Sequence, residues 1–139
     1  MEGGWIYVLM TSSDYNRYKV GLTKNNPMLR MNQLKTGDPL IGLDVAYFIP
    51  NTLGKLSKVE AALHAHLGDP IEFHSGEASE WFFGDPQDAW RVLDTIFKLL
   101  GYEVTDYFDP DAQKVVRFWA ADLEFYFNPP KTDEYGFPL

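Results

Sequence analysis

The chain has 139 residues, of which 45% are hydrophobic and 16% aromatic. This composition is typical of one folded globular domain, with or without a small appendage, and it excludes a largely disordered protein. Because the sequence has no cysteine, it excludes disulfides, thiolate zinc sites and cysteine nucleophiles, and it favours a cytoplasmic protein.

The charge of the chain is distributed unevenly. The formal net charge is −8, which on its own argues against nucleic acid as a partner. Residues 1–58, however, carry seven Lys and Arg against four acids, whereas residues 59–139 carry five against sixteen. Only the N-terminal half is therefore expected to face a polyanion. The opening MEGGWIYVLM lacks a basic segment and its apolar run is short, so we expect neither a signal peptide nor a membrane partner.

The N-terminal segment predicts a β-hairpin. Residues 4–10 and 17–23 alternate in the manner of strands, and SSDYN between them supplies the turn. One face is apolar and carries Ile6, Val8, Met10, Tyr18, Val20 and Leu22. The other face carries Trp5, Tyr7, Leu9, Arg17, Lys19 and Gly21. We interpret this second face as the polar one, on which Tyr7 and Lys19 are neighbours.

Capping residues then mark a short helix and a third strand. Asn26 has the character of an N-cap, Pro27 suits the first helical position, and Arg30 falls on the first turn. Met28, Met31 and Leu34 are expected to point inward. The segment LDVAYFIP at residues 43–50 predicts a strand that ends at its proline.

Two further helices are predicted in the middle of the chain. Residues 57–67 are amphipathic and place Glu60 and His64 one turn apart. The run EWFF at residues 80–83 is typical of a short edge strand. Residues 86–100 predict a helix that begins after Asp85 and stops at Gly101.

The C-terminal segment is expected to form an acidic extension. The pattern favours a helix over residues 110–121, a strand over residues 123–127 and a loose tail. The predicted fold class is α/β (α+β), with a small, mainly antiparallel three-stranded sheet flanked by helices. The predicted division is a domain over residues 1–100 and an α/β extension over residues 101–139.

The order of these motifs resembles the GIY-YIG endonuclease family over roughly residues 4–97. The two name-giving motifs are WIY, in which Trp5 stands at the first glycine, and KVG, in which Lys19 stands at the second tyrosine. A phage-associated branch of the family is similar in YKVGLT, in the Arg after a proline-started turn, in EAALH and in EWF. We therefore expect a GIY-YIG-like fold.

The resemblance implies hydrolysis of DNA phosphodiester bonds with Mg²⁺ or Mn²⁺. Tyr7 would activate water, Arg30 would hold the scissile phosphate and Glu60 would bind the metal. Lys19 and His64 would assist. The attack of water on a phosphodiester needs a general base, a cationic group that holds the phosphate and a Lewis acid. Because tyrosine is a weak base at its ordinary pKa near 10, we expect Lys19 to lower the pKa of Tyr7.

Simpler interpretations remain open at this point. Glu60 could instead form a capping box with Ser57, and Glu80 could complete a metal shell or merely precede two buried aromatic residues. The chain could also be a silent or weakly active binding module that acts through a protein partner on its acidic C-terminal half. RNA is not excluded as a substrate, since backbone chemistry does not distinguish the sugars.

Overall fold

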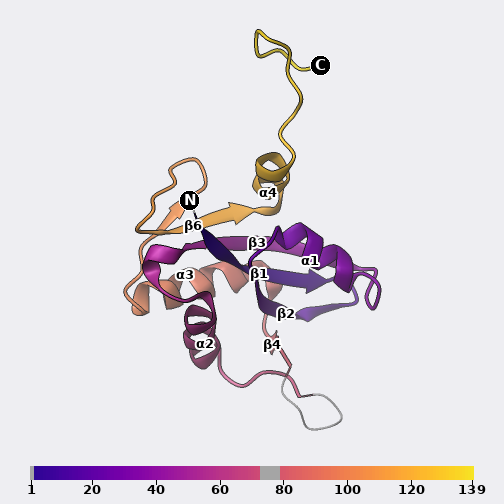
Figure 1. Cartoon of the computed structure of the whole chain (residues 1–139). Coiled ribbons are helices and arrows are strands. Elements are labelled where there is room, and N and C mark those ends of the chain that lie inside the picture. The colour runs from indigo at the N-terminus through magenta and orange to yellow at the C-terminus, as the bar shows by residue number, and fades with distance from the viewer. Residues whose placement is uncertain (1, 73–78) are drawn as a thin grey trace.

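The computed structural model describes residues 2–72 and 79–139, which form a six-stranded sheet covered by four helices (Figure 1). The strands are β1 (Gly3–Thr11), β2 (Asp14–Thr23), β3 (Ile41–Pro50), β4 (Trp81–Phe83), β5 (Val104–Asp106) and β6 (Val115–Trp119). The helices are α1 (Pro27–Leu34), α2 (Leu56–Leu67), α3 (Ala89–Leu99) and α4 (Ala120–Phe127).

The strand order is β4-β2-β1-β3-β6-β5, and only the β5–β6 pair is parallel in the part of the chain that the structure describes. The mixed α/β class and the mainly antiparallel pairing are thus confirmed. The prediction of three strands is wrong, because β4, β5 and β6 extend the sheet on both sides.

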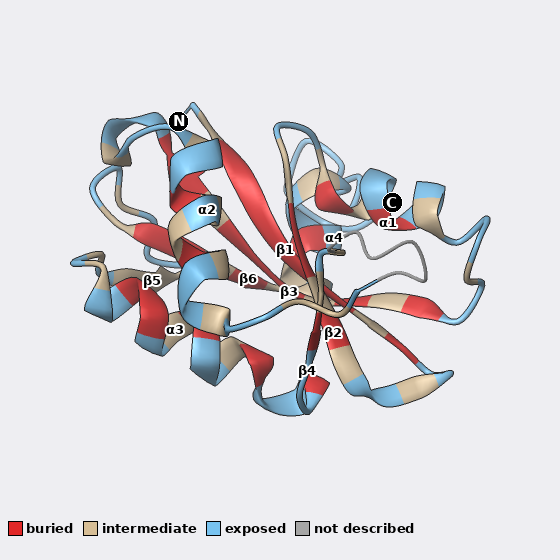
Figure 2. Ribbon diagram, turned by 90° about the horizontal axis from the view of Figure 1, so that it is seen from below, coloured by how far each residue is buried: buried red, intermediate tan, exposed pale blue. Residues whose placement is uncertain are grey.

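The sheet is covered on both faces. Ile6 and Val8 pack towards α2 and α3, whereas Trp5, Tyr7 and Leu9 pack towards α1 and α4 (Figure 1). All five side chains are buried, and Figure 2 shows buried residues along most of β1. The expectation of a polar hairpin face is therefore wrong for β1, because a second layer of helices covers that face.

Helix α1 begins as the sequence predicts. The Asn26 side chain accepts a hydrogen bond from the Met28 backbone N–H at 2.9 Å, and Pro27 occupies the first turn. At the next predicted cap, Asp85 accepts a hydrogen bond from the Gln87 backbone N–H at 2.9 Å. There the first turn is a short 3₁₀ helix, η2 (Pro86–Asp88), and α3 follows directly.

Helix α2 begins one residue earlier than predicted. The backbone N–H groups of Lys58 and Val59 both donate to the Lys55 carbonyl at 3.1 Å, so Lys55 is the N-cap and Ser57 lies inside the first turn. No described side chain caps this helix end. The capping-box interpretation of Ser57 and Glu60 is therefore wrong. Leu56 accounts for the early start, because it packs against the core beside Gly4.

The C-terminal elements are the reverse of the prediction. Part of the predicted helix is strand β6, and the predicted strand is helix α4. Val115 faces one core cluster and Val116 faces the other, so β6 is buried on both faces and shows no two-residue alternation. In α4, Leu123 and Phe127 both pack on one cluster at helical spacing.

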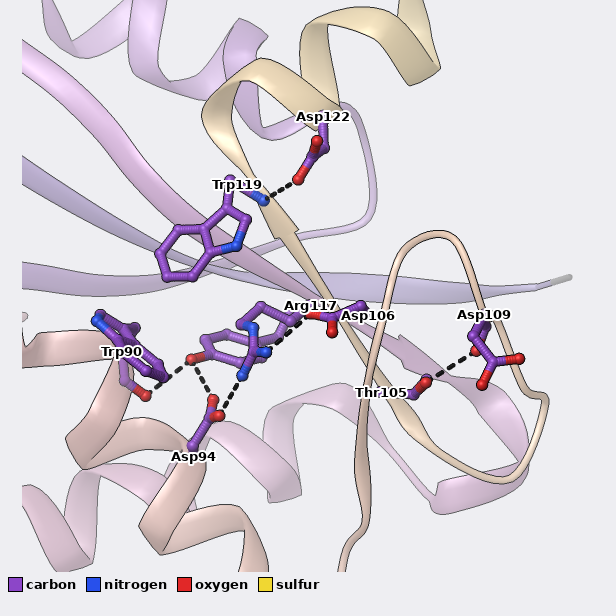
Figure 3. Close-up of polar contacts among 9 residues, drawn as sticks. Trp90, Asp94, Thr105, Asp106, Asp109, Arg117, Trp119 and Asp122 are labelled. Atoms are coloured by element: carbon purple, nitrogen blue, oxygen red, sulfur yellow. Dashed lines mark hydrogen bonds and ion pairs between the residues drawn. The ribbon is translucent and has the colours of Figure 1, made fainter.

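A half-buried ionic network attaches this segment to the rest of the fold (Figure 3). Arg117 of β6 forms ion pairs with Asp94 of α3 and Asp106 of β5. The Tyr47 hydroxyl of β3 donates to Asp94 at 2.7 Å, and the Arg117 guanidinium lies 5.4 Å from the Trp90 ring. Residues 1–100 and 101–139 thus meet in one sheet. Beyond α4, the chain runs away from the body as an exposed tail (Figure 1).

Candidate functional site

The site centres on Tyr7 of β1. Tyr7 pairs with Gly21 of β2 in the sheet register, and its ring lies across that glycine. A β-carbon at position 21 would stand 2.5 Å from the Tyr7 hydroxyl oxygen and 2.6 Å from the ring carbon that bears it. The glycine of KVG therefore leaves the space that the phenol occupies above β2.

Lys19 lies on the same face of β2, two residues before Gly21. Its ammonium is 3.4 Å from the Glu80 carboxylate, which directly precedes β4. Strand β4 pairs with β2 only over residues 17–19, and a further hydrogen bond joins the Val20 N–H to the Glu80 carbonyl. The end of β4 thus places the Lys19–Glu80 pair beside the part of β2 that passes under Tyr7.

Helix α2 brings Glu60 and His64 to this part of β2 from the opposite face of the sheet. The His64 Nε2 atom is 3.1 Å from the Val20 carbonyl and 4.0 Å from the nearer Glu60 oxygen. The His64 ring also packs edge-on against Phe82 of β4, with ring centroids 5.1 Å apart. These contacts fix the imidazole and hold the helix against the β2 strand.

Arg30 approaches Tyr7 from α1. Arg30 is exposed, and its guanidinium donates to the Gln33 side chain at 3.1 Å, one turn along the helix. Its positive charge nevertheless acts on the Tyr7 hydroxyl and favours the phenolate form. The N-cap at Asn26 sets the start of α1 and thereby directs Arg30 towards the site.

Glu60 is the most perturbed carboxyl group of the site. Burial, and secondly the negative charge of Glu80, raise its pKa from 4.5 to about 7, while Lys19 acts in the opposite direction. One oxygen of the Glu60 carboxylate is buried without a hydrogen-bond partner in the described part of the chain. Such an oxygen is costly unless a ligand binds it.

The pKa of Tyr7 is also raised, chiefly by burial, and Glu80 and Glu60 add to the effect. The neighbouring Arg30 is the cation that lowers it. The expectation that Lys19 performs this role is wrong, because Lys19 pairs with Glu80 and acts on Glu60.

The donor set fits a hard divalent cation that keeps most of its own water. Among residues 2–72 and 79–139, no three His, Cys, Asp or Glu side chains converge to hold a metal by themselves. Mg²⁺ is commonly bound by one or two carboxylates together with waters and substrate phosphates. The unpartnered Glu60 oxygen suits this mode, and Glu80 is the second carboxylate whose charge reaches it.

The five predicted residues thus lie around the strand segment 19–21, although they come from β1, β2, α1 and α2. Their chemical roles stay predictions. Sequence reasoning missed Gly21, whose lack of a side chain seats the phenol, and it undervalued Glu80, which pairs with Lys19. The glycine of the KVG motif was the feature of the sequence that could have identified Gly21.

The chain belongs to the T5orf172 domain family, whose model matches residues 4–98. This phage-associated family is compatible with a nuclease-like or DNA-binding function. Comparisons with curated proteins and with solved structures give no significant match. Within the part of the chain that the structure describes, no helix is long and apolar enough to cross a membrane.

Proposed function

We propose that the protein is a divalent-metal-dependent endonuclease that hydrolyses DNA, with a GIY-YIG-like site at Tyr7, Lys19, Arg30, Glu60 and His64. The observation that carries the proposal is a buried Glu60 oxygen without a hydrogen-bond partner, together with a buried tyrosine on which the charges of Glu60 and Arg30 both act, all within the described part of the chain. Perturbed titratable groups that face one another are typical of catalytic sites.

Arg30 is the residue suited to the substrate phosphate. Its guanidinium is exposed and presents a planar set of N–H donors, which match phosphate oxygens in pairs. Because its charge already acts on Tyr7, a phosphate held by Arg30 would lie close to the phenol. Arg30 would also offset the negative charge that develops in the transition state.

Tyr7 is the proposed general base. Burial makes its hydroxyl a poor base in the protein alone, since the pKa is raised. Glu60 would hold Mg²⁺ or Mn²⁺, which would supply a Lewis acid for the phosphate and would offset the negative charge of Glu60. Neutralising the Glu60 and Glu80 charges removes two of the effects that raise the Tyr7 pKa. Tyr7 would then accept a proton from the attacking water.

Lys19 and His64 are assigned supporting roles. Lys19 pairs with Glu80, and its charge stabilises ionised Glu60. His64 is held by the Val20 carbonyl beside Glu60 and fixes the position of that part of α2. Both residues are thus positioning residues for the carboxylate.

Nicking of supercoiled plasmid tests the proposal. We expect cleavage with Mg²⁺ or Mn²⁺, none with EDTA, and a loss of about 100-fold or more in Tyr7→Phe. Tyr18→Phe is the matched control, because Tyr18 is also a buried strand tyrosine with a raised pKa, but it lies in the other core cluster. Equal rates in the two variants would exclude Tyr7 as the base. A folded wild type that binds DNA but never nicks it would favour a binding module.

A further inference from the structure

A groove of about 920 Å³ lies at the start of β1 and of α2. Trp5, which lines it, is two residues from Tyr7 on the same face of β1. Leu56 and Ser57 form another part of the wall and precede Glu60 by one turn of α2. The groove therefore adjoins the parts of β1 and α2 that carry Tyr7 and Glu60.

One side of the groove is a set of contacting aromatic rings. The Trp5 ring centroid is 5.7 Å from that of Phe127 and 6.3 Å from that of Tyr126, and the Tyr126 and Phe127 centroids are 5.0 Å apart. Trp5 is only 5% exposed, whereas Tyr126 is 59% exposed. Tyr126 thus presents an accessible aromatic ring that is held by neighbours within the fold.

The charge around the groove is opposite to that of the whole chain. Lys24 and Lys55 line it and are exposed, and Glu2 is the acidic residue among the described lining side chains. The chain as a whole carries a formal charge of −8. A polyanion that is repelled by most of the surface would therefore find cationic groups here, next to an aromatic ring.

We infer that this groove binds an unpaired nucleotide of a DNA substrate, with its base stacked on Tyr126 and its phosphates near Lys24 and Lys55. A base inside a duplex has both faces covered, so an aromatic ring can stack only on a base that has left the helix or lies in a single strand. The inference rests on the proposed function and specifies its substrate class. The enzyme would cleave DNA next to a single-stranded or distorted segment.

Binding without metal tests the inference independently of cleavage. The full chain in EDTA is titrated into a fluorescein-labelled thymidine oligonucleotide and into a blunt duplex of equal length. We expect tighter binding of the single strand. Tyr126→Ala should weaken binding of the single strand by about 5- to 150-fold, the usual range for one lost base stack, and should leave duplex binding unchanged.

Phe125→Ala is the matched control. Phe125 is also 59% exposed and lies on the same helix, but it does not belong to the described lining of the groove. We expect it to bind both ligands as the wild type does. Because the Tyr126 ring packs against Trp5 and Phe127, Tyr126→Ala should melt somewhat below the wild type, whereas Phe125→Ala should keep the wild-type melting temperature, and binding is compared at a temperature where both variants are folded. Lys24→Gln should also reduce the salt dependence of binding, whereas Lys98→Gln, an exposed lysine on α3, should not.

Two results would overturn the inference: no preference for the single strand in the wild type, or equal losses in Tyr126→Ala and Phe125→Ala. Failure of the proposed function gives a different result, in which Tyr126 supports single-strand binding but plasmid is never nicked. If plasmid is nicked and Tyr126→Ala has no effect on either assay, the inference alone fails.

Discussion

Tyr7 lies across Gly21 so closely that position 21 has no room for a methyl group. A β-carbon at that position would stand 2.5 Å from the phenol oxygen, which is closer than β-carbons approach other atoms in real proteins. The tyrosine and the glycine are paired in adjacent strands, so neither can move without disturbing the sheet. The position of the phenol is thus fixed by the lack of a side chain on the neighbouring strand.

We expect Gly21→Ala to lose most DNA cleavage and about 1–3 kcal/mol of unfolding free energy, because the added methyl group displaces the Tyr7 ring. Gly42→Ala is the control, since a β-carbon at that strand position meets no described atom within 4 Å. Urea unfolding and plasmid nicking compare the two. Full activity in Gly21→Ala would show that the placement of the phenol does not matter for cleavage.

Glu60→Gln should abolish most Mn²⁺ binding while keeping a melting temperature within a few degrees of wild type. The amide keeps the shape of the side chain but removes the charge that a hard cation requires. Ser57→Ala should change neither property, because Ser57 is exposed inside the first turn of α2 and is not its cap. Calorimetric titration of Mn²⁺ into each protein measures its affinity for the metal. Equal affinity in wild type and Glu60→Gln would remove Glu60 as the metal ligand.

The raised pKa of Glu60 predicts a pH-dependent stability in EDTA. Because the folded protein holds this proton up to about pH 7 and the unfolded chain releases it near 4.5, the stabilising contribution is complete below pH 4.5 and is lost as pH rises towards 7. The loss should be on the order of 3 kcal/mol. Glu80 and Lys19 act on this carboxyl, and His64 lies 4.0 Å away.

The comparison with Glu60→Gln isolates this effect, since the amide does not titrate. Urea unfolding of both proteins at pH 5 and pH 8 should show the variant gaining stability relative to wild type at the higher pH. A constant difference between the two proteins across that range would contradict the assignment.

Asp94→Ala should destabilise the fold strongly. Asp94 binds both Tyr47 and Arg117 with only 16% of its side chain exposed, and its removal leaves a half-buried guanidinium with one fewer partner (Figure 3). Because Arg117 keeps its ion pair with Asp106, the loss should be about 2–3 kcal/mol, below the cost of leaving a fully buried charge without a partner. Asp88→Ala, which breaks an exposed pair with Arg91, should cost less than about 1 kcal/mol. Thermal unfolding compares the stability of the two variants. Similar losses of stability in Asp94→Ala and Asp88→Ala would mean that the network contributes little.

The elements that sequence predicts well are those whose signals are local. The Asn26–Pro27 start of α1 depends on neighbouring residues, and the structure confirms it. Strands β1 and β2 also form where the sequence predicts them, although β1 is buried on both faces. The start of α2 could not be predicted in this way, because packing of Leu56 beside Gly4 outweighs the capping signal of Ser57. Tertiary contacts override local preference at such a position.

The C-terminal segment and the electrostatics of the site needed the three-dimensional structure. Strand β6 is recognisable only with β3 beside it, because burial on both faces removes its alternation. The predicted site residues come together, but sequence did not show that Arg30 rather than Lys19 influences the Tyr7 hydroxyl. That difference depends on the short strand β4, which brings Glu80 to Lys19.

The position of β6 has a consequence for the order of events during synthesis. The family match ends at residue 98, yet β3 receives its second neighbouring strand from residues 115–119, and Leu123 completes the cluster around Tyr7. A nascent chain that has emerged from the ribosome only as far as α3 therefore exposes one edge of β3 and an incomplete core. An open strand edge is a template for pairing with other chains. A chain truncated after residue 100 should thus favour chaperone binding or aggregation, whereas a chain truncated after residue 127 should not.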